Sequence, residues 1–380
     1  MKALVIGRGR SGQAAEKALA ARGDAADTAD GYELVVASPG VRVMSELEFG
    51  VRELLKRGVK CLAVTGSKGK SSVVKVVAEG LAFAGFTATA CGNYGRAVSD
   101  LVTDPAALAG APEGKCWAVV EVSSFQMETT NLPADAFEAA VILNLQEDHL
   151  DRHGGVEVYH ALKRRLLKMA KRGAECLAPD ARSARLARGS YFDNPVLAAN
   201  GAMAVWLLDA AGVPENVIRE AFARFEPLAH RMNNLGVFGG VRAIDDSKAT
   251  SLAALQAGVI MATSDSADKS APSAKKIRLI AGGLPKGDDP ASVVPLLTER
   301  VKKVYLIGKS AEAFSNAWKP AVDCEICGDM ERAVGKAMRE AECGETVLLS
   351  PGTASFDQFK SFGERGDVFA ALIKKEGQKR

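Results

Sequence analysis

The amino-acid sequence predicts an α/β fold with mostly parallel sheets, divided into three domains. Short apolar segments alternate with helical segments along the chain, an order typical of parallel sheets that carry helices on both faces. The 380 residues, of which 47% are hydrophobic, are enough for two or three separate cores. The alternation falls into three blocks, so we expect domains at residues 1–58, 59–228 and 229–380.

The first block opens with a strand–turn–helix unit. Residues 2–6 (KALVI) predict a buried strand, which is followed by the turn GRGRSG and the helical segment QAAEKALAARG. A second strand is expected at residues 32–38, and only a short polar segment lies between Gly23 and Gly31. We therefore expect a small Rossmann-like domain at the N-terminus.

The second and third blocks continue the alternation. In the second block, strands are expected at residues 61–66, 117–123, 139–144 and 175–179, and helices at 73–86, 156–173 and 200–212. The third block predicts strands, each followed by a helical segment, at residues 241–247, 276–283, 302–308 and 345–352. The polar segment 263–276 is typical of a mobile loop. Each block therefore predicts an α/β domain, and the last is again Rossmann-like.

Composition and charge exclude several classes of protein. With 49 basic and 46 acidic side chains, the net charge of +3 is too small for electrostatic binding to nucleic acid or to an anionic membrane. No apolar run approaches the length of a membrane span, and the N-terminal run is too short for a signal peptide. Seven cysteines without a disulfide framework favour a reducing compartment. We expect a monomeric cytoplasmic protein that neither binds nucleic acid nor inserts into membranes.

The turn from Gly66 to Ser71 (GSKGKS) predicts a phosphate site. It resembles a P-loop, with two residues between its glycines where the standard pattern has four. Its N–H groups and the following helix would hold an anion, Lys70 adds a charge, and Ser71 or Ser72 can bind Mg²⁺. An ordinary glycine-rich turn is the alternative. The earlier turn GRGRSG is a weak dinucleotide match, because the acidic residues that follow it, Asp24 and Asp27, come too early for a standard dinucleotide unit.

Acidic residues follow the ends of three predicted strands. Glu121 ends the strand WAVVEV, and Asp245 and Asp246 close the strand VRAIDD, positions where open α/β sheets present functional side chains. The strand AAVILN leads into a turn with acids and histidines, which favours a hard metal beside ATP phosphates over zinc: Glu147, Asp148, His149, Asp151 and His153. Solvated acidic turns and helix caps are the alternatives.

Nine stretches in this order resemble the Mur ligases, and most closely the branch that adds D-glutamate. They are SPGV at 38, VTGSKGKSS at 64, CGNYG at 91, EVSSFQMETT at 121, ILNLQEDHLDRH at 142, YHALK at 159, LAHR at 228, IDDSKATS at 244 and LLSPGTASFDQFKSFGERG at 348. The last two are the most specific. The resemblance implies an N-terminal domain for the UDP-linked substrate, a central ATP-binding domain and a C-terminal domain for the amino acid.

The resemblance also implies a reaction and its catalytic groups. ATP would phosphorylate the carboxylate of UDP-N-acetylmuramoyl-L-alanine, and the amine of D-glutamate would attack the acyl phosphate. Lys70 would hold the β- and γ-phosphates, together with the other residues of the turn: Gly66, Ser67, Lys68, Gly69, Ser71 and Ser72. Ser71 and Glu121 would hold one Mg²⁺ ion, and His149 would hold a second. Lys163 matches a carbamylated lysine that assists the second metal, although its pattern alone is typical of an exposed helical lysine.

Other matching positions imply substrate contacts. Near the reacting carboxyl group these are Asn93, Ser123, Ser124 and Gln126, and for ATP they are Asn200, Arg231, Asp246 and Lys248. For D-glutamate they are Lys286, Ser355 and Phe362, although the spacing FDQFKSF is also typical of core phenylalanines. For the UDP group they are Arg10 and Ser11 at the diphosphate, Asp27 and Thr28 at the uracil, and Ser38.

The chain also departs from the family pattern. Its first domain is short, and a stretch of the central domain is missing between Pro179 and Asn200. Leu284 stands where an acid is usual, and Lys68 replaces an asparagine in the phosphate turn. Two alternatives stay open: a related ligase that uses another amino acid, and a nucleotide-precursor sensor without turnover. For a ligase we expect the C-terminal domain to close about residues 228–233.

Overall fold

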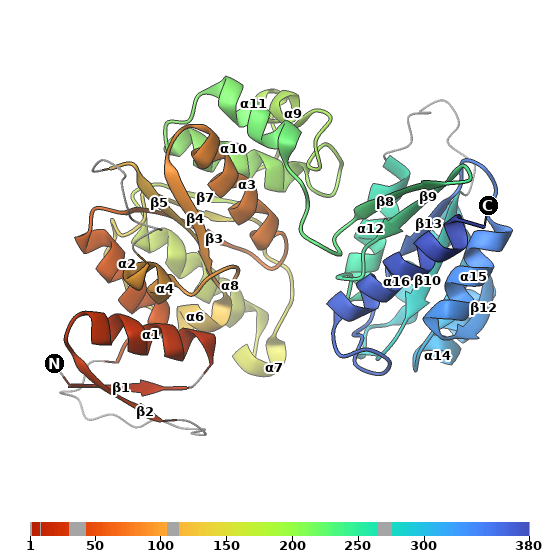
Figure 1. Cartoon of the computed structure of the whole chain (residues 1–380), viewed down its shortest axis with the longest axis horizontal. Coiled ribbons are helices and arrows are strands. Elements are labelled where there is room, and N and C mark those ends of the chain that lie inside the picture. Colours follow the sequence, from red (N-terminus) through yellow and green to blue (C-terminus); the bar gives the residue numbers. More distant parts are fainter. Residues whose placement is uncertain (1, 8, 30–42, 105–113, 265–275, 380) are drawn as a thin grey trace. The chain divides into compact units, whose positions relative to one another are not determined.

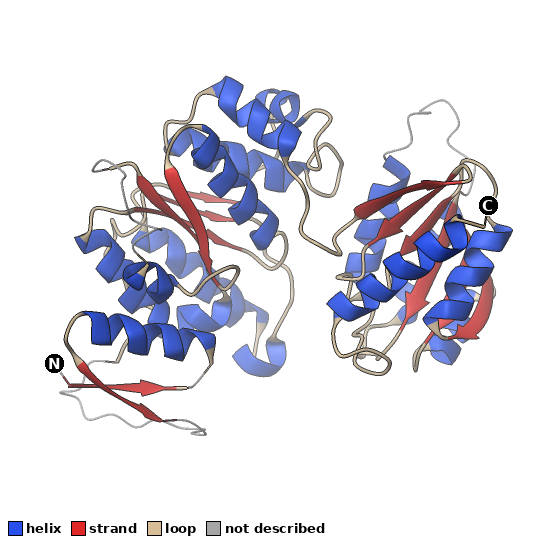
Figure 2. Cartoon of the chain, in the orientation of Figure 1, coloured by secondary structure: helices blue, strands red, loops and turns tan. Residues whose placement is uncertain are grey.

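The computed structural model describes residues 2–7, 9–29, 43–104, 114–264 and 276–379 (Figure 1). The chain forms two compact units, one of residues 1–193 and 197–225, the other of residues 194–196 and 226–380. Each unit is α/β, in agreement with the predicted fold class (Figure 2). The division of the first unit into the segments 1–58 and 59–228 stays a prediction.

The N-terminal segment forms a two-stranded parallel sheet. β1 (Lys2–Ile6) pairs with β2 (Ala25–Ala29), and α1 (Arg10–Ala21) connects them. β2 was not expected, because its residues AADTA belong to the short polar segment after Gly23. The expected burial of β1 was also wrong for one face: Val5 is buried, but Leu4 is 60% exposed. The strand expected at residues 32–38 lies outside the described residues.

The first unit is built around a parallel five-stranded sheet in the order β4–β5–β3–β6–β7. Its strands are β3 (Lys60–Thr65), β4 (Thr87–Gly92), β5 (Cys116–Glu121), β6 (Ala139–Ile142) and β7 (Gly173–Glu175). β4 was missed from the sequence, because its residues TATACG include no large apolar side chain. β7 is shorter than expected and begins two residues earlier.

Helices lie on both faces of this sheet (Figure 2). The described helices of this unit after β2 are α2 (Glu46–Lys56), α3 (Lys70–Phe83), α4 (Val98–Thr103), α6 (Ser124–Thr129), α7 (Leu150–His153), α8 (Val156–Arg164), α9 (Ala181–Ala187), α10 (Ala198–Ala210) and α11 (Glu215–Arg224). The helix expected at residues 156–173 is α8 followed by a 3₁₀ turn at Arg165–Met169. Because the strands are parallel, their carboxyl ends meet at one edge of the sheet, where the predicted phosphate turn follows β3.

The second unit has a six-stranded sheet in the order β12–β11–β10–β13–β9–β8. The strands are β8 (Asn233–Phe238), β9 (Val241–Asp245), β10 (Ile277–Gly282), β11 (Val301–Ile307), β12 (Asp323–Gly328) and β13 (Thr346–Leu349). Only the edge strand β8 is antiparallel. β8 and β12 were not expected, because their sequences NNLGVF and DCEICG are polar at several positions, as edge strands can be.

Two hydrophobic cores cover the two faces of this second sheet. One core packs α12 (Leu252–Ser264), α13 (Val294–Arg300) and α14 (Ala311–Trp318) against the strands. The other packs α15 (Met330–Glu340) and α16 (Phe362–Gly377). The chain order reverses between β10 and β13, and ligands of open α/β sheets bind at such a point.

Candidate active site at the carboxyl ends of the strands

The predicted phosphate turn connects β3 to α3 in the first unit. Gly69 has φ of +86°, and a Cβ atom there would lie 2.3 Å from the side-chain nitrogen of Asn200. Glycine is therefore required by both conformation and space. Lys70 begins α3, and its Nζ donates to the carbonyl oxygens of Gly66 at 2.8 Å and Ser67 at 3.2 Å. The turn is compact, with its lysine held against its own backbone.

The loop after β6 holds the phosphate turn in place. Asn144 Oδ1 accepts from the Lys68 N–H, and Asn144 Nδ2 donates to the Lys68 carbonyl, both at 2.9 Å. Ser67 Oγ accepts from the Tyr159 hydroxyl at 3.1 Å and donates to the Gln146 carbonyl at 3.1 Å. Asn144 and Tyr159 were missed as site residues. The only sequence signal for Asn144 is a polar residue just beyond a buried strand.

Lys163 is buried beside the phosphate turn, with 1% of its surface exposed. Its Nζ donates to the Gly66 carbonyl at 3.1 Å and lies 4.5 Å from the centre of the Tyr159 ring. Burial, followed by the positive charge of Lys70, lowers the pKa of Lys163 to about 7. The interpretation of Lys163 as an exposed helical lysine is therefore excluded, and a large fraction of this amine is neutral near pH 7.

Glu121 ends β5 and is 2% exposed. Its Oε1 accepts from Asn93 Nδ2 at 2.8 Å, whereas its buried Oε2 has no hydrogen-bond partner. A buried carboxylate oxygen without a partner fits a hard cation such as Mg²⁺. In the described part of the chain, no three His, Cys, Asp or Glu side chains gather as a metal cluster. A Mg²⁺ ion here would therefore take further ligands from substrate oxygens and water.

His149 lies in the loop after β6 with a positive φ of +53°. Its side chain is 46% exposed, lies 3.7 Å from an Asp148 carboxylate oxygen and packs edge-on against the Phe125 ring. His153 is instead held inside, with Nε2 3.0 Å from Ser124 Oγ and Nδ1 3.3 Å from a Glu128 oxygen. The two histidines of this turn therefore differ: His149 is accessible, and His153 is part of the packing.

Ser123 and Gln126 form the capping box of α6. Ser123 Oγ accepts from the Gln126 N–H at 3.2 Å, and Gln126 Oε1 accepts from the Ser123 N–H at 2.9 Å. Each side chain therefore satisfies a main-chain donor at the helix start. Ser124 is buried against His153. Of the four residues predicted near the reacting carboxyl group, Ser123, Ser124 and Gln126 thus have structural partners at the edge that also holds Glu121.

The predicted UDP contacts lie in the N-terminal segment. Arg10, at the start of α1, donates to the Gly95 carbonyl in the loop after β4, and Ser11 is exposed beside it. On β2, Asp27 is exposed, and the buried hydroxyl oxygen of Thr28 has no hydrogen-bond partner. Ser38 lies outside the described residues.

In the second unit, two acids close β9. Asp246 is buried, and this burial raises its pKa to about 7. The Ser350 hydroxyl donates to Asp246 Oδ2 at 3.0 Å, and the Met232 N–H lies 3.3 Å from Oδ1. Asp245 pairs with His230 at 2.7 Å. The edge of the sheet thus holds one acid in contact with a histidine and another that is about half protonated at pH 7.

Four of the other predicted residues of this unit, Lys248, Lys286, Ser355 and Phe362, lie on the segments that follow β9, β10 and β13, and Arg231 precedes β8. The Nζ of Lys248 lies 3.9 Å from the centre of the Phe362 ring, so Phe362 is only partly a core residue. Lys286 is exposed, and its Nζ lies 3.4 Å from Thr250 Oγ1. Ser355 is buried after β13. Arg231 is half-buried, and its charge acts on Asp246.

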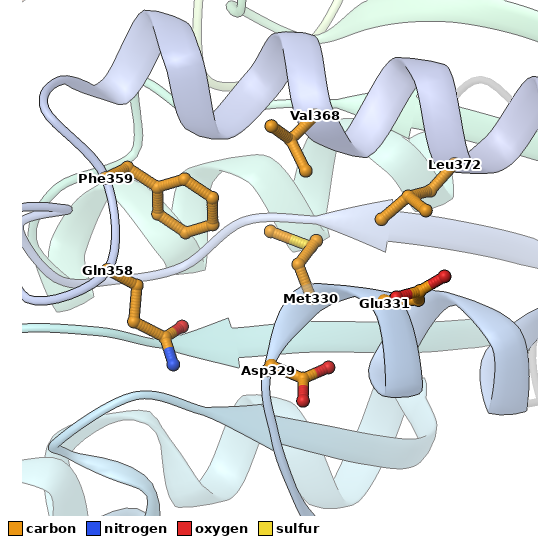
Figure 3. Close-up of a pocket in the computed structure, with 7 residues that line it drawn as sticks. All are labelled: Asp329, Met330, Glu331, Gln358, Phe359, Val368 and Leu372. Atoms are coloured by element: carbon orange, nitrogen blue, oxygen red, sulfur yellow. The ribbon is translucent and has the colours of Figure 1, made fainter.

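A pocket of about 520 Å³ lies between the start of α15 and α16 (Figure 3), and the N–H groups of its lining residues Gln358 and Phe359 donate to the Ser355 carbonyl. Its lining is mainly apolar, with acids at one side: Asp329, Met330, Glu331, Gln358, Phe359, Val368 and Leu372. The acids already have cationic neighbours, because Glu331 pairs with Lys375 at 3.2 Å and Asp329 with Arg332 at 3.5 Å.

Two family models match the chain. That of the Mur ligase middle domain matches residues 64–189, and that of the Mur ligase, glutamate ligase domain matches residues 230–352. The UDP-N-acetylmuramoylalanine--D-glutamate ligase of Nitratidesulfovibrio vulgaris is 32% identical over 98% of this chain and 95% of the relative. The protein of the same name from Cereibacter sphaeroides is 36% identical over 83% of this chain and 74% of the relative.

The alignment with the Nitratidesulfovibrio relative spans 438 positions, more than the 380 residues of this chain, so that relative has residues without a counterpart here. Among solved structures, the MurF ligase from Thermotoga maritima in complex with ADP has a TM-score of 0.61 at 16% identity, covering 100% of this chain and 95% of that chain. This likeness concerns the fold and confirms the predicted α/β class. None of the described helices combines the length and apolar character that a membrane crossing requires.

Proposed function

The chain belongs to the Mur ligase family, and on that premise we propose that it is an ATP-dependent ligase adding D-glutamate to UDP-N-acetylmuramoyl-L-alanine for peptidoglycan synthesis. The observation that carries the proposal is the likeness to ligases of that name at 32–36% identity over most of the chain. The phosphate turn, with Lys163 and Glu121 buried beside or near it, supports an ATP-using reaction.

We assign the phosphoryl-transfer step to the first unit. The turn from Gly66 to Ser72 and the start of α3 would bind the ATP phosphates through N–H groups, and Lys70 would turn from its own carbonyls to the β- and γ-phosphates. Glu121, through its unpartnered Oε2, and Ser71 would hold Mg²⁺, which neutralises phosphate charge when bound. His149, accessible in its loop, would hold a second Mg²⁺.

Lys163 is our candidate for carbamylation. Only a neutral amine attacks CO₂, and burial supplies that form by lowering the pKa of Lys163 to about 7. Its nitrogen would bond to the carbon of CO₂ and lose one proton, which leaves a negative carbamate beside the charge of Lys70. Such a group would replace the repulsion between two cations near the Gly66 carbonyl with an attraction.

We assign amino-acid binding to the second unit. Lys286, Ser355 and Phe362 lie on the segments that follow β10 and β13, where the chain order of the sheet reverses. A lysine and a serine are suitable donors to a dicarboxylate such as D-glutamate. Asn200, Arg231, Asp246 and Lys248 would contact ATP. Because the reaction consumes ATP and a nucleotide-linked precursor, we infer a cytoplasmic location.

The test is phosphate release from ATP with Mg²⁺ and UDP-N-acetylmuramoyl-L-alanine, compared across D-glutamate, L-glutamate, D-aspartate, L-lysine and meso-diaminopimelate. We expect release with D-glutamate alone. Release with another amino acid would keep the ligase chemistry and reassign the substrate. If no amino acid triggers release although ATP binds, the proposed ligase function is wrong and a sensor without turnover is favoured.

A further inference from the structure

Arg365, on α16, is an arginine that is fully buried at the carboxyl ends of the second sheet. Its Nε donates to Ser247 Oγ at 3.0 Å, and its Nη2 to the Ser247 carbonyl at 2.8 Å and the Thr353 carbonyl at 3.1 Å. Its Nη1 lies 3.3 Å from the Ala354 carbonyl. The guanidinium thus joins the segment after β9 to the segment after β13.

A second buried arginine, Arg278, lies at the amino ends of the strands of the same sheet and has different partners from Arg365. Arg278, near the start of β10, pairs with Glu345 at 2.6 Å and donates to the Tyr305 hydroxyl at 2.7 Å. No described carboxylate forms an ion pair with Arg365, whose bonds go to one hydroxyl and three main-chain carbonyls. Asp357 and Asp245 act on the Arg365 guanidinium through their charge but form no ion-pair contact with it, and burying a cation without such a contact is costly.

The residues that Arg365 holds adjoin the predicted binding residues. Ser247 lies between Asp246 and Lys248, and its hydroxyl also donates to the carbonyl of Phe362 at 2.8 Å. Ser355 follows Thr353 and Ala354 directly. One guanidinium and one hydroxyl therefore connect three segments that carry predicted contacts of this unit, namely those of Asp246 and Lys248, of Ser355, and of Phe362.

We propose that Arg365 is a positioning residue that sets the spacing between the segment of Lys248 and the segment of Ser355, so that ATP and the amino acid bind in register. This inference rests on the proposed function. A lysine could not replace it, because an ammonium is a point charge on a flexible stem, whereas the planar guanidinium presents several donors in fixed directions. Gly283 lies close to this group, because a Cβ atom there would lie 3.2 Å from Arg365 Nη1.

The experiment compares Arg365→Lys with the matched control Arg278→Lys in the full chain, below the unfolding temperature of both. Each variant disturbs a buried arginine of the same sheet, so a general loss of stability affects both. For Arg365→Lys we expect the KM values for D-glutamate and ATP to rise about tenfold, as for the loss of charged hydrogen bonds, with the KM for the UDP-linked substrate unchanged. For Arg278→Lys we expect all three KM values to stay unchanged.

Ser247→Ala keeps the arginine but removes its hydroxyl partner, and we expect a smaller rise in the same two KM values. Unchanged KM values in Arg365→Lys, or equal rises in both arginine variants, would overturn the proposal. Calorimetric binding of a non-hydrolysable ATP analogue gives a readout without turnover. If the wild-type protein releases no phosphate, the proposed function fails separately, and positioning is then judged by whether Arg365→Lys alone weakens analogue binding.

Discussion

The two units bury opposite ionisable groups near the carboxyl ends of their sheets, and burial brings both to the same pKa. Lys163 falls to about 7 in the first unit, and Asp246 rises to about 7 in the second. Their surroundings differ. Lys163 shares the Gly66 carbonyl with a second cation, Lys70, whereas Asp246 accepts a hydrogen bond from Ser350.

This difference indicates two uses of burial. In the first unit, repulsion from Lys70 adds to desolvation, and both favour the neutral amine. In the second unit, the hydrogen bond from Ser350 opposes desolvation and retains part of the acidity of Asp246. The neutral amine of Lys163 is therefore suited to reaction at its nitrogen. The carboxyl group of Asp246 is suited to accepting a hydrogen bond or binding a cation.

The largest expected effect is on turnover in the first unit. Lys163→Ala should lower kcat about 10²–10³-fold, because it removes a buried group that acts on the phosphoryl-transfer charge. Binding of ATP, measured by calorimetry, should survive. The control is Lys168→Ala, an exposed lysine in the following 3₁₀ turn, which should keep wild-type kcat. Equal kcat values in the two variants would remove Lys163 from the mechanism.

In each unit, a glycine packs closely against a predicted site residue. Gly69→Ala should lower the free energy of unfolding by about 2–4 kcal/mol, since it adds a positive-φ penalty to crowding of Asn200. Gly85→Ala has a similar φ of +83° but open space, and should cost about 1 kcal/mol.

In the second unit, Gly258→Ala places a Cβ 2.6 Å from Asp246 Oδ2 inside a helix, so crowding acts there without backbone strain, and we expect about 1–3 kcal/mol. Urea unfolding measures all three glycine variants. If Gly69→Ala and Gly85→Ala cost the same, crowding by Asn200 contributes nothing.

The two shifted groups should give opposite pH dependences of stability. Between pH 3.8 and about 7, the folded chain keeps a proton on Asp246 that the unfolded chain has lost, so stability falls as pH rises. Between about 7 and 10.5, the unfolded chain keeps a proton that folded Lys163 has lost, so stability rises with pH. Each slope should be at most ~1.4 kcal/mol per pH unit.

Single substitutions separate the two contributions. The free energy of unfolding is measured with urea at each pH. Asp246→Asn should reduce its fall below pH 7, and Lys163→Met should reduce its rise above pH 7. If the unfolding free energy of Asp246→Asn fell with pH below 7 as steeply as that of the wild type, Asp246 would not be the source of this pH dependence.

The smallest effect distinguishes a helix cap from a substrate contact. Ser123→Ala, at α6 of the first unit, and Ser361→Ala, at α16 of the second, each remove a capping hydroxyl and should each cost about 1 kcal/mol of stability. Only Ser123→Ala should also raise the KM for UDP-N-acetylmuramoyl-L-alanine. An unchanged KM would leave Ser123 with its capping role alone.

Local pattern was sufficient for the parts of the site that lie along one stretch of chain. The apolar strand, the two glycines and Lys70 at the helix start predicted the phosphate turn, because strand, turn and helix signals act between near neighbours. Glu121 was found in the same way, as an acid at the end of an apolar strand. The α/β class followed from the same alternation of short apolar and helical segments.

Only the tertiary structure decided which side chains are buried and which distant groups they meet. Lys163 reaches Gly66 and Asn144 reaches Lys68 across 97 and 76 residues of chain, so no local pattern contains these bonds. The same holds for Arg365 and Ser247, which are 118 residues apart. Burial, which shifts the pKa of Lys163 and Asp246, is a property of the packed core and not of sequence position. The sequence by itself therefore determined the local elements and the chemical types present, whereas packing determined their protonation and their partners.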